Sequence, residues 1–354
     1  MTLFQRILHR PFFIRLFNWE YWSFTSVYIL IYPVWIFLCI RARSFFFFSA
    51  SNPSIKNGGF LNESKKDIAP LIPQHLQPKT LYFSLPANGN IVLKQLKENG
   101  LSYPLIGKPD IGGRGRGVKA LKDDEDVSRY VSTACLDFHI QEYVAYKNEV
   151  GIFYCRIPGE DKGQITGIVR KEFMSITGDG KATVSQLLKR QSRALLYMSA
   201  FEKMHKEIWN TVLEEGSKMI ISPYGNHARG ALFLDDSHLV DETLLNSFDA
   251  ICKQIPDFYY GRLDIRFDNW EDLRFGKKLC IIEVNGAGSE PTHMYDPKHS
   301  LFFAWKEIIR HWVLLWRISR INHKKGVPYM SFRQGIAMFK EDELWSSKLD
   351  AMPV

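Results

Sequence analysis

The segment Ile281-Ile-Glu-Val-Asn-Gly-Ala-Gly-Ser-Glu290 opens with alternating apolar and polar side chains. A second alternating segment, Tyr260-Gly-Arg-Leu-Asp-Ile-Arg-Phe267, lies just upstream. This period of two predicts two strands, each with one buried face. Residues 269–278 between them are polar and include Gly276, which favours a hairpin connection.

The predicted hairpin gathers polar side chains on one face. Arg262 and Asp264 project from the same face of the first strand, and Glu283 and Asn285 from the same face of the second. Their oxygen atoms suit Mg²⁺, which takes one or two carboxylates together with substrate phosphates. The pattern therefore predicts the metal platform of a phosphate-transferring site. An ordinary hairpin with solvated charges is the alternative.

Length and composition fit one large or two moderate domains. The chain has 354 residues, of which 45% are hydrophobic, and its net charge of +8 favours anionic partners such as a nucleotide or an anionic membrane surface. No nucleic-acid recognition motif is present, so no nucleic-acid partner is expected. The five cysteines are odd in number, scattered and without a C-x-x-C pair. They predict reduced thiols in a cytoplasmic protein.

An apolar stretch, residues 21–40, contains no Asp, Glu, Lys or Arg. Its length is enough to cross a hydrocarbon core, and Trp22 and Trp35 suit an interface. Pro33 would kink such a helix, which also fits a segment lying on the surface. We expect residues 1–48 to attach a cytoplasmic protein to the inner face of the membrane. A buried wall of the protein's own core is the alternative.

A glycine-rich loop follows a short apolar segment that ends in Gly-Lys108-Pro. Side-chain-free backbone can approach phosphates closely, and its N–H groups form an anion-binding nest. The loop's arginines add positive charge, whereas the spacing is not that of a Walker loop. A phosphate lid is favoured over a flexible linker. Its glycines and arginines are Gly112, Gly113, Arg114, Gly115, Arg116 and Gly117.

Residues 139–149 alternate and run into 150–158, which predicts two strands joined by a short turn. The backbone of residues 141–144 could serve a purine edge, and Glu149 could accept from ribose hydroxyls. Residues 165–173 form a further predicted strand. Thr183 is placed to cap a helix that follows the Gly-Asp-Gly turn at 178–180.

These motifs, in this order, resemble the ATP-grasp superfamily, and most of all the D-alanine–D-alanine ligase-like carboxylate–amine ligases. The resemblance covers roughly residues 63–315 and rests on five motifs of this sequence. They are Gly-Lys-Pro with the glycine loop, Gln-Glu-Tyr-Val with a later Glu, Gly-Asp-Gly-x-x-Thr-Val-x-x-Leu-Leu, Gly-Arg-x-Asp and Glu-Val-Asn-Gly. It implies an α+β fold, the ATP-grasp fold, in which two α+β subdomains grip ATP.

The resemblance also implies site residues. Arg262 and Lys108 take catalytic roles, with Arg262 stabilising the tetrahedral intermediate. The magnesium (or manganese) ligands are Asp264, Glu283 and Asn285. The ATP-binding residues are Lys65, Lys108, Gly112, Gly113, Arg114, Gly115, Gln141, Glu142, Tyr143, Val144, Glu149 and Lys171. Lys66 competes with Lys65 for the earlier nucleotide lysine.

The implied activity is ATP-dependent activation of a carboxylate as an acyl phosphate, which an amine then attacks. The carboxylate and the amine are unknown. A non-amine acceptor and an inactive nucleotide-binding, membrane-associated protein are the alternatives. Asn226, His227 and Arg229 in the loop 222–231 suit carboxylate recognition; a structural loop is equally compatible.

The expected organisation has four parts. Residues 1–60 form the hydrophobic N-terminal segment, 61–104 a short preceding region, 105–325 the ATP-grasp domain and 326–354 a C-terminal tail. Residues 301–321 carry polar positions at helical spacing and predict an amphipathic helix. A short peripheral helix without chemistry is expected after residue 330.

Overall fold

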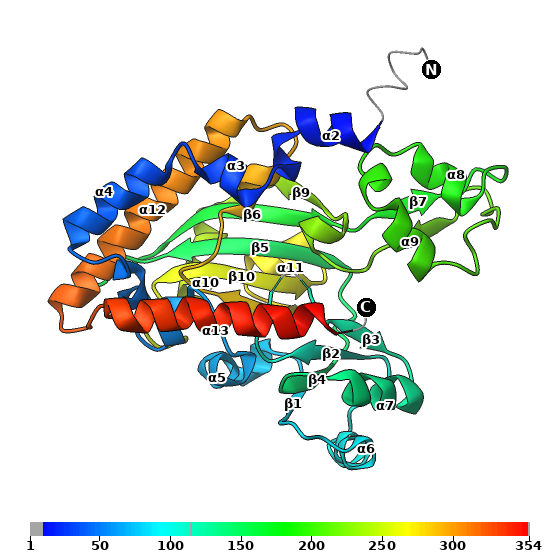
Figure 1. Ribbon diagram of the computed structural model, residues 1–354, viewed down its shortest axis with the longest axis horizontal. Coiled ribbons are helices and arrows are strands. Elements are labelled where there is room, and N and C mark those ends of the chain that lie inside the picture. Colours follow the sequence, from blue (N-terminus) through cyan, green and yellow to red (C-terminus); the bar gives the residue numbers. More distant parts are fainter. Residues whose placement is uncertain (1–9, 114, 353–354) are drawn as a thin grey trace. The chain divides into compact units, whose positions relative to one another are not determined.

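The computed structural model describes residues 10–113 and 115–352 (Figure 1). It shows a mixed α+β fold, which confirms the fold class expected from the sequence. The chain divides into two compact units. One comprises Met1–Tyr32, Val169–Asp236 and Thr292–Glu307, and the other comprises Pro33–Ile168, Ser237–Pro291 and Ile308–Val354. We refer to them as the smaller and the larger unit.

The larger unit contains a four-stranded antiparallel sheet in the order β1-β4-β2-β3. Helices α6 and α7 pack on it through the buried side chains of one hydrophobic cluster. Asp123 caps α7, because its side chain accepts a hydrogen bond from the Asp126 N–H. The elements are β1 (Thr80–Phe83), α6 (Gly89–Glu98), β2 (Leu105–Pro109), β3 (Lys119–Leu121), α7 (Asp124–Thr133) and β4 (Phe138–Glu142).

A second sheet has the order β11-β10-β5-β6-β9, and its strands β11, β10 and β5, which pair antiparallel, belong to the larger unit. One face packs on α10 and is uniformly apolar, with Leu263, Ile265 and Phe248 fully or almost fully buried. The opposite face carries the charged side chains of β10 and β11. The elements are β5 (Asn148–Cys155), β6 (Gln164–Glu172), α10 (Glu242–Lys253), β10 (Tyr260–Phe267), α11 (Trp270–Arg274) and β11 (Leu279–Asn285).

The expected hairpin is confirmed. Strands β10 and β11 pair with Arg262 opposite Asn285 and Asp264 opposite Glu283, and a bulge follows Asp264. The connection is more than a turn, because it contains the short helix α11, which Asn269 caps. The alternation of the sequence therefore places all four polar side chains on one face of the sheet.

The strands predicted at 139–149 and 150–158 form, but they do not pair with each other. β4 belongs to the four-stranded sheet, whereas β5 lies beside β10 in the other sheet. The short connection at residues 143–147 thus carries the chain from one sheet to the next. Alternation identifies a strand, but it does not identify the strand's partner.

The apolar N-terminal stretch is not one helix. It is divided among η1 (Trp19–Tyr21), α3 (Phe24–Tyr28) and α4 (Tyr32–Ala42). Among residues 10–113 and 115–352, no helix has the length and apolar character that a membrane span requires. Membrane attachment through residues 1–48 stays a prediction, and residues 1–9 lie outside the described part.

Helix α4 lies along α12 (Leu301–Lys324), the long amphipathic helix that the spacing at 301–321 predicted (Figure 1). Trp35 contacts Trp312 with the ring centroids 5.2 Å apart, and Phe47 and Phe48 are completely buried beside them. This part of the aromatic stretch is therefore core, as the buried-wall alternative expected. Other α4 side chains, Ile36, Phe37 and Ile40, are more than half exposed.

A C-terminal helix and several short elements also belong to the larger unit. Residues 332–350 form the helix α13 (Phe332–Asp350), which is longer than the expected peripheral helix and begins with a capping box between Ser331 and Gln334. The five cysteines are free. The remaining elements are η2 (Phe47–Ala50), η3 (Lys56–Gly59), α5 (Lys65–Ile68), η4 (Ala69–Leu71), η5 (Gln74–Leu76) and η8 (Ser237–Leu239).

The smaller unit has its own hydrophobic cluster around Val184, Phe201 and Ile221. The predicted helix cap at Thr183 is confirmed, since Thr183 and Gln186 form a capping box. The end of β6 pairs with β9, and β7 with β8. Its other elements are α2 (Pro11–Phe17), β7 (Ser175–Thr177), α8 (Val184–Lys189), η6 (Ala194–Leu196), α9 (Met198–Met204), β8 (Lys218–Ile220), η7 (His227–Arg229), β9 (Leu232–Asp235) and η9 (Thr292–Tyr295).

Candidate active site

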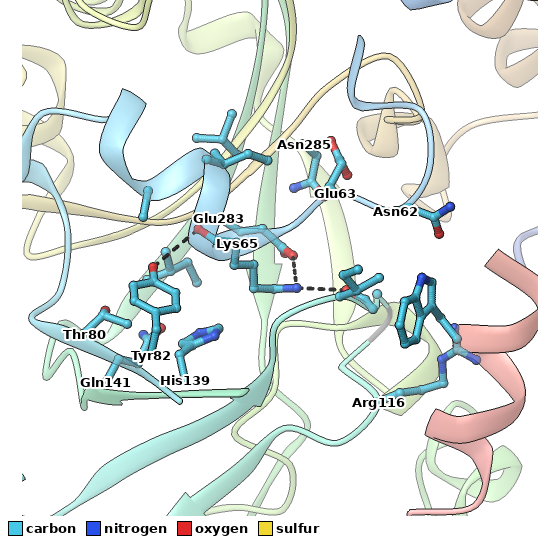
Figure 2. A pocket seen from close by; sticks show the side chains of 18 of the residues that line it. Asn62, Glu63, Lys65, Thr80, Tyr82, Arg116, His139, Gln141, Glu283 and Asn285 are labelled. Atoms are coloured by element: carbon cyan, nitrogen blue, oxygen red, sulfur yellow. Dashed lines mark hydrogen bonds and ion pairs between the residues drawn. The ribbon is translucent and has the colours of Figure 1, made fainter. Parts of the chain in front are cut away.

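A cavity of about 530 Å³ lies within the larger unit, between α5, the strands β1, β4 and β11, the glycine loop and α13 (Figure 2). Of the residues predicted for the site, it is lined by Lys65, Gly112, Gly113, Gln141, Glu283 and Asn285. It therefore brings together side chains from positions more than 200 residues apart in the sequence.

Arg262 and Asp264 form a buried, bidentate ion pair beside this cavity. Arg262 Nε lies 2.8 Å from Asp264 Oδ1, and Nη2 lies 3.2 Å from Oδ2. Asp264 is 4% exposed, so the guanidinium compensates a carboxylate that would otherwise be buried without a counter-charge. Arg262 also donates to the Glu290 carbonyl at 3.4 Å. The pair fixes both side chains on the face that β10 and β11 share.

Glu283 and Asn285 complete the predicted metal set. Glu283 lies 4.0 Å from Lys65 Nζ, and Asn285 Nδ2 is buried without a partner among the described residues. No described cluster of three or more His, Cys, Asp or Glu is arranged for a metal, but this set needs only two carboxylates and an amide. Hard oxygen donors on two paired strands fit Mg²⁺ that keeps waters and takes the remaining ligands from phosphates.

Two lysines and the glycine loop surround a second, smaller cavity of about 70 Å³. Lys65, in α5 as expected, donates from Nζ to the carbonyls of Asp110 at 3.2 Å and Gly112 at 3.0 Å. Lys108 and Glu283 line the same space. Burial lowers the pKa of Lys108 to about 8, although the charge of Glu283 opposes the shift. The space is cationic at neutral pH and suits phosphate oxygens.

We expect the affinity for ATP to fall as the pH rises through about 8, because Lys108 then loses the charge that attracts phosphate. Titration calorimetry with ATP between pH 7 and 9.5 measures this. Lys108→Met should bind weakly with a much flatter pH dependence. Lys94→Met removes an exposed charge on α6 and should behave as the unmodified chain does. An affinity that stays constant over this range would contradict the role of Lys108.

Glu63 is a residue of the cavity that the sequence motifs did not indicate. Its carboxylate accepts a hydrogen bond from the Gly286 N–H at 2.7 Å. Burial raises the pKa of Glu63 to about 7, and the charge of Glu283 adds to the shift. At Gly286, a Cβ would lie 2.7 Å from the Gly59 Cα, so only glycine allows this approach of two backbones. The Gly-Gly turn at 58–59 thus lies against the residues that follow β11.

The structure separates the residues predicted for the adenine and ribose. Gln141 is buried and lines the cavity, whereas Glu142, Tyr143 and Val144 are not among its lining residues. Glu142 instead accepts from the Lys79 N–H at 2.9 Å. Glu149 is buried in an ion pair with Arg266 at 2.9 Å. Arg266 lies two residues after Asp264 on the same face of β10, and it meets Glu149 because β10 pairs with β5.

Helix α13 reaches the cavity, which the sequence did not predict. Asp342, Trp345 and Ser346 line it together with Arg116, and Leu349 lies against the glycine loop. A Cβ at Gly112, whose φ is +138°, would lie 2.7 Å from Leu349 Cδ1. Arg116 Nη1 lies 3.2 Å from Asp350 Oδ1. No local pattern in residues 330–354 signals a partner more than 200 residues earlier.

The predicted substrate loop 222–231 lies in the smaller unit and is tied to the N-terminal segment. His227 Nε2 lies 2.9 Å from Glu20 Oε2, and Arg193 Nη2 lies 2.6 Å from the same oxygen. Burial raises the pKa of Glu20, but the hydrogen bond with His227 and the charge of Arg193 outweigh it and leave the pKa below its ordinary value. Asn226 caps η7.

The sequence predicted roles for three further residues. Arg229 lies over the ring of Tyr224, 4.4 Å from its centroid, in the same loop. Lys171 is buried on β6 in the smaller unit, opposite Phe233 of β9. Arg114 lies outside the described residues. The roles predicted for the loop, for Lys171 and for Arg114 stay predictions.

Comparisons with known proteins return solved structures, whereas no protein-family model and no curated protein matches the chain. The chain is similar to D-alanine–D-alanine ligase from Bacillus anthracis complexed with ATP, with 12% identity, TM-score 0.43 and coverage of 74% of this chain and 68% of that one. It is also similar to a bifunctional glutathione synthetase from Pasteurella multocida, with 13% identity, TM-score 0.37 and coverage of 74% and 38%.

A third similar structure is the VanG D-Ala:D-Ser ligase from Enterococcus faecalis, with 14% identity, TM-score 0.40 and coverage of 72% of this chain and 61% of that one. The matched region thus spans between about a third and two thirds of these ligases' own length. Their names agree with the resemblance drawn from the motifs. These three TM-scores lie below 0.5, so the similarity carries no functional argument.

Proposed function

We propose that the protein is an ATP- and Mg²⁺-dependent ligase, which activates a carboxylate as an acyl phosphate and joins it to an amine. The observation that supports this most is the pairing of Arg262 with Asn285 and of Asp264 with Glu283 across β10 and β11. It sets a carboxylate–amide face beside a cavity whose opposite wall holds Lys65 and the glycine loop. Phosphoryl transfer requires this combination of positioning and charge neutralisation.

The chain's own groups have distinct tasks in this proposal. Lys65, Lys108 and the backbone N–H groups of residues 112–115 bind the triphosphate, and Arg262 stabilises negative charge that develops on the substrate carbonyl. Asp264, Glu283 and Asn285 would hold Mg²⁺, which when bound neutralises and orients the phosphates. The carboxylate oxygen attacks the γ-phosphorus, and ADP leaves with the electron pair of the broken P–O bond.

Carboxylate-dependent release of ADP from the purified full chain tests the proposal. A panel of carboxylates with Mg²⁺ and ATP should include substrates that release ADP. Hydroxylamine should trap the acyl phosphate as a hydroxamate in the same reactions. Tight binding of ATP without carboxylate-dependent ADP or hydroxamate would refute the ligase and favour a nucleotide-binding protein. Hydroxamate formation with no amine accepted would favour the non-amine acceptor.

A further inference from the structure

Six large apolar side chains are exposed where three helices of the larger unit end or begin. In Figure 1, the end of α4, the end of α12 and the start of α13 lie at the left of the view. The exposed fraction of each of these side chains is between 39% and 68%. They are Phe37, Ile40, Phe45, Phe332, Ile336 and Phe339. We call this surface the apolar face. A cluster of exposed apolar side chains of this kind marks an interaction surface.

Contacts between the helices hold the apolar face together. Gly335 lets α13 approach Phe46 closely, since a Cβ at this position would overlap the Phe46 ring. The preceding residue, Phe45, meets Phe332 with the ring centroids 6.2 Å apart. Phe46 is buried, whereas Phe45 and Phe332 are more than 60% exposed despite their contact. Phe46 thus joins the first turns of α13 to the core, and the other two rings remain on the surface.

The segments that contain the apolar face are basic. Residues 33–62 and 308–340 carry ten Lys or Arg and no Asp or Glu. This excess is larger than the chain's whole net charge of +8, so the two segments account for its basic character. Two of the ten cations are paired with carboxylates from elsewhere in the chain, Lys56 with Glu341 and Arg317 with Glu160. Most of the positive charge is therefore left for an external partner.

Four arginines of these segments form no ion pair within residues 10–113 and 115–352. They are Arg41, Arg43, Arg320 and Arg333. Arg41 and Arg320 lie over the ring of Trp316, with each guanidinium carbon 5.9 Å and 5.2 Å from the centroid. Such cation–π contacts hold a guanidinium in place and leave its N–H groups available for anionic oxygens.

The charge around the apolar face distinguishes between possible partners. A second copy of this chain would bring the same cations to the interface, because a two-fold interface uses the same patch on both partners, and like charges brought together repel. An anionic bilayer has the opposite charge. Phenylalanine and tryptophan flanked by arginine are the composition of a helix surface that lies in a bilayer interface. Attachment of this kind requires no membrane-spanning helix, and none is found in residues 10–113 and 115–352.

We propose that the apolar face attaches the larger unit to the surface of a bilayer that contains anionic phospholipid. Its phenylalanine and isoleucine side chains enter the boundary between headgroups and acyl chains, and the arginines contact headgroup phosphates. The sequence predicted attachment through residues 1–48. The inference assigns it to residues 37–45 and adds residues 332–339 of α13, for which the sequence predicted no chemistry. It does not depend on the proposed ligase function.

Co-sedimentation of the full chain with vesicles tests the inference. One set of vesicles consists of phosphatidylcholine, and the other also contains about one third phosphatidylserine. The partition coefficient should be about tenfold or more higher for the anionic vesicles, since each cation near an anionic surface contributes about a fivefold increase. Added NaCl should lower it, because salt screens this attraction.

Two double variants separate the apolar and the charged contributions. Phe45→Ser with Phe332→Ser, and Arg43→Gln with Arg333→Gln, should each lower the partition coefficient for the anionic vesicles about tenfold or more. Phe275→Ser and Lys94→Gln are the matched controls, because they remove an exposed ring and an exposed charge elsewhere in the larger unit. Both controls should bind as the native chain does. Urea midpoints establish that each variant is folded.

Three results would overturn the inference. They are equal binding to the two kinds of vesicle, native binding by both double variants, and absence of binding to either vesicle. Native binding by both double variants would assign attachment to other residues. If no vesicle is bound, sedimentation velocity tests the alternative partner: a dimer that the double variant Phe45→Ser with Phe332→Ser disrupts would assign the apolar face to a second copy of the chain.

Discussion

Glu283→Gln is expected to lower carboxylate-dependent ADP release about 100- to 1,000-fold, the range found when one preorganised electrostatic contact is removed from an active site. The glutamine keeps the size of the side chain but removes the charge that we assign to the metal. The fold should survive, because the nearest cation, Lys65 Nζ, is 4.0 Å away and the carboxylate is about one third exposed. ADP release and the urea midpoint, measured on the same preparation, separate the two effects.

The matched control is Glu271→Gln, which removes an exposed carboxylate from α11 in the same hairpin. It should leave ADP release unchanged. Asp264→Asn should differ from both, because it also leaves Arg262 without its buried counter-charge, at a cost of about 3–5 kcal/mol of stability. If Glu283→Gln released ADP at the native rate, Glu283 would not be a metal ligand.

Leu349→Ala is expected to destabilise the chain by about 2–5 kcal/mol, the usual cost of emptying a buried leucine site. Leu349 is 3% exposed and packs with Phe138, Ile140 and other side chains of the four-stranded sheet and its helices. It also contacts the glycine loop, so the KM for ATP should rise as well. Urea unfolding followed by tryptophan fluorescence and the ATP dependence of turnover measure the two effects.

Leu344→Ala provides the control on the same helix. Leu344 is 52% exposed, so the same truncation there should cost less than about 1 kcal/mol and leave the KM for ATP unchanged. Equal unfolding midpoints for the two variants would mean that α13 is not part of the core. A destabilised Leu349→Ala with a native KM would mean that α13 does not hold the glycine loop.

The shared face of Arg262, Asp264, Glu283 and Asn285 could be predicted because it depends on local periodicity. Arg262 and Asp264 are two residues apart, as are Glu283 and Asn285, and a strand puts such residues on one face whatever it packs against. The glycine loop was predictable for a similar reason, since closely spaced glycines after Lys108 have a local conformational meaning. The sequence analysis assigned Glu149 to ribose and did not foresee its ion pair with Arg266, because that pair depends on β5 lying beside β10.

Local periodicity could not predict which of the two sheets each strand joins. The segments 138–142 and 148–155 are adjacent in the sequence and both alternate, yet they join different sheets. Likewise, the uncharged run 21–40 has the composition of one long helix but forms several short elements. The composition of a segment indicates how strongly burial of its side chains is favoured. The rest of the fold determines which residues cover each of those side chains.

The amino-acid sequence by itself determined the two strands of the hairpin, the cross-strand set of Arg262, Asp264, Glu283 and Asn285, and the glycine-rich loop after Lys108, because each depends on residues close together in the chain. Only the tertiary structure decided that α13 closes one end of the cavity, since its contact with Arg116 joins residues 230 positions apart. Such a contact arises from the packing of complementary surfaces, and the local hydrophobic period of the sequence does not predict it.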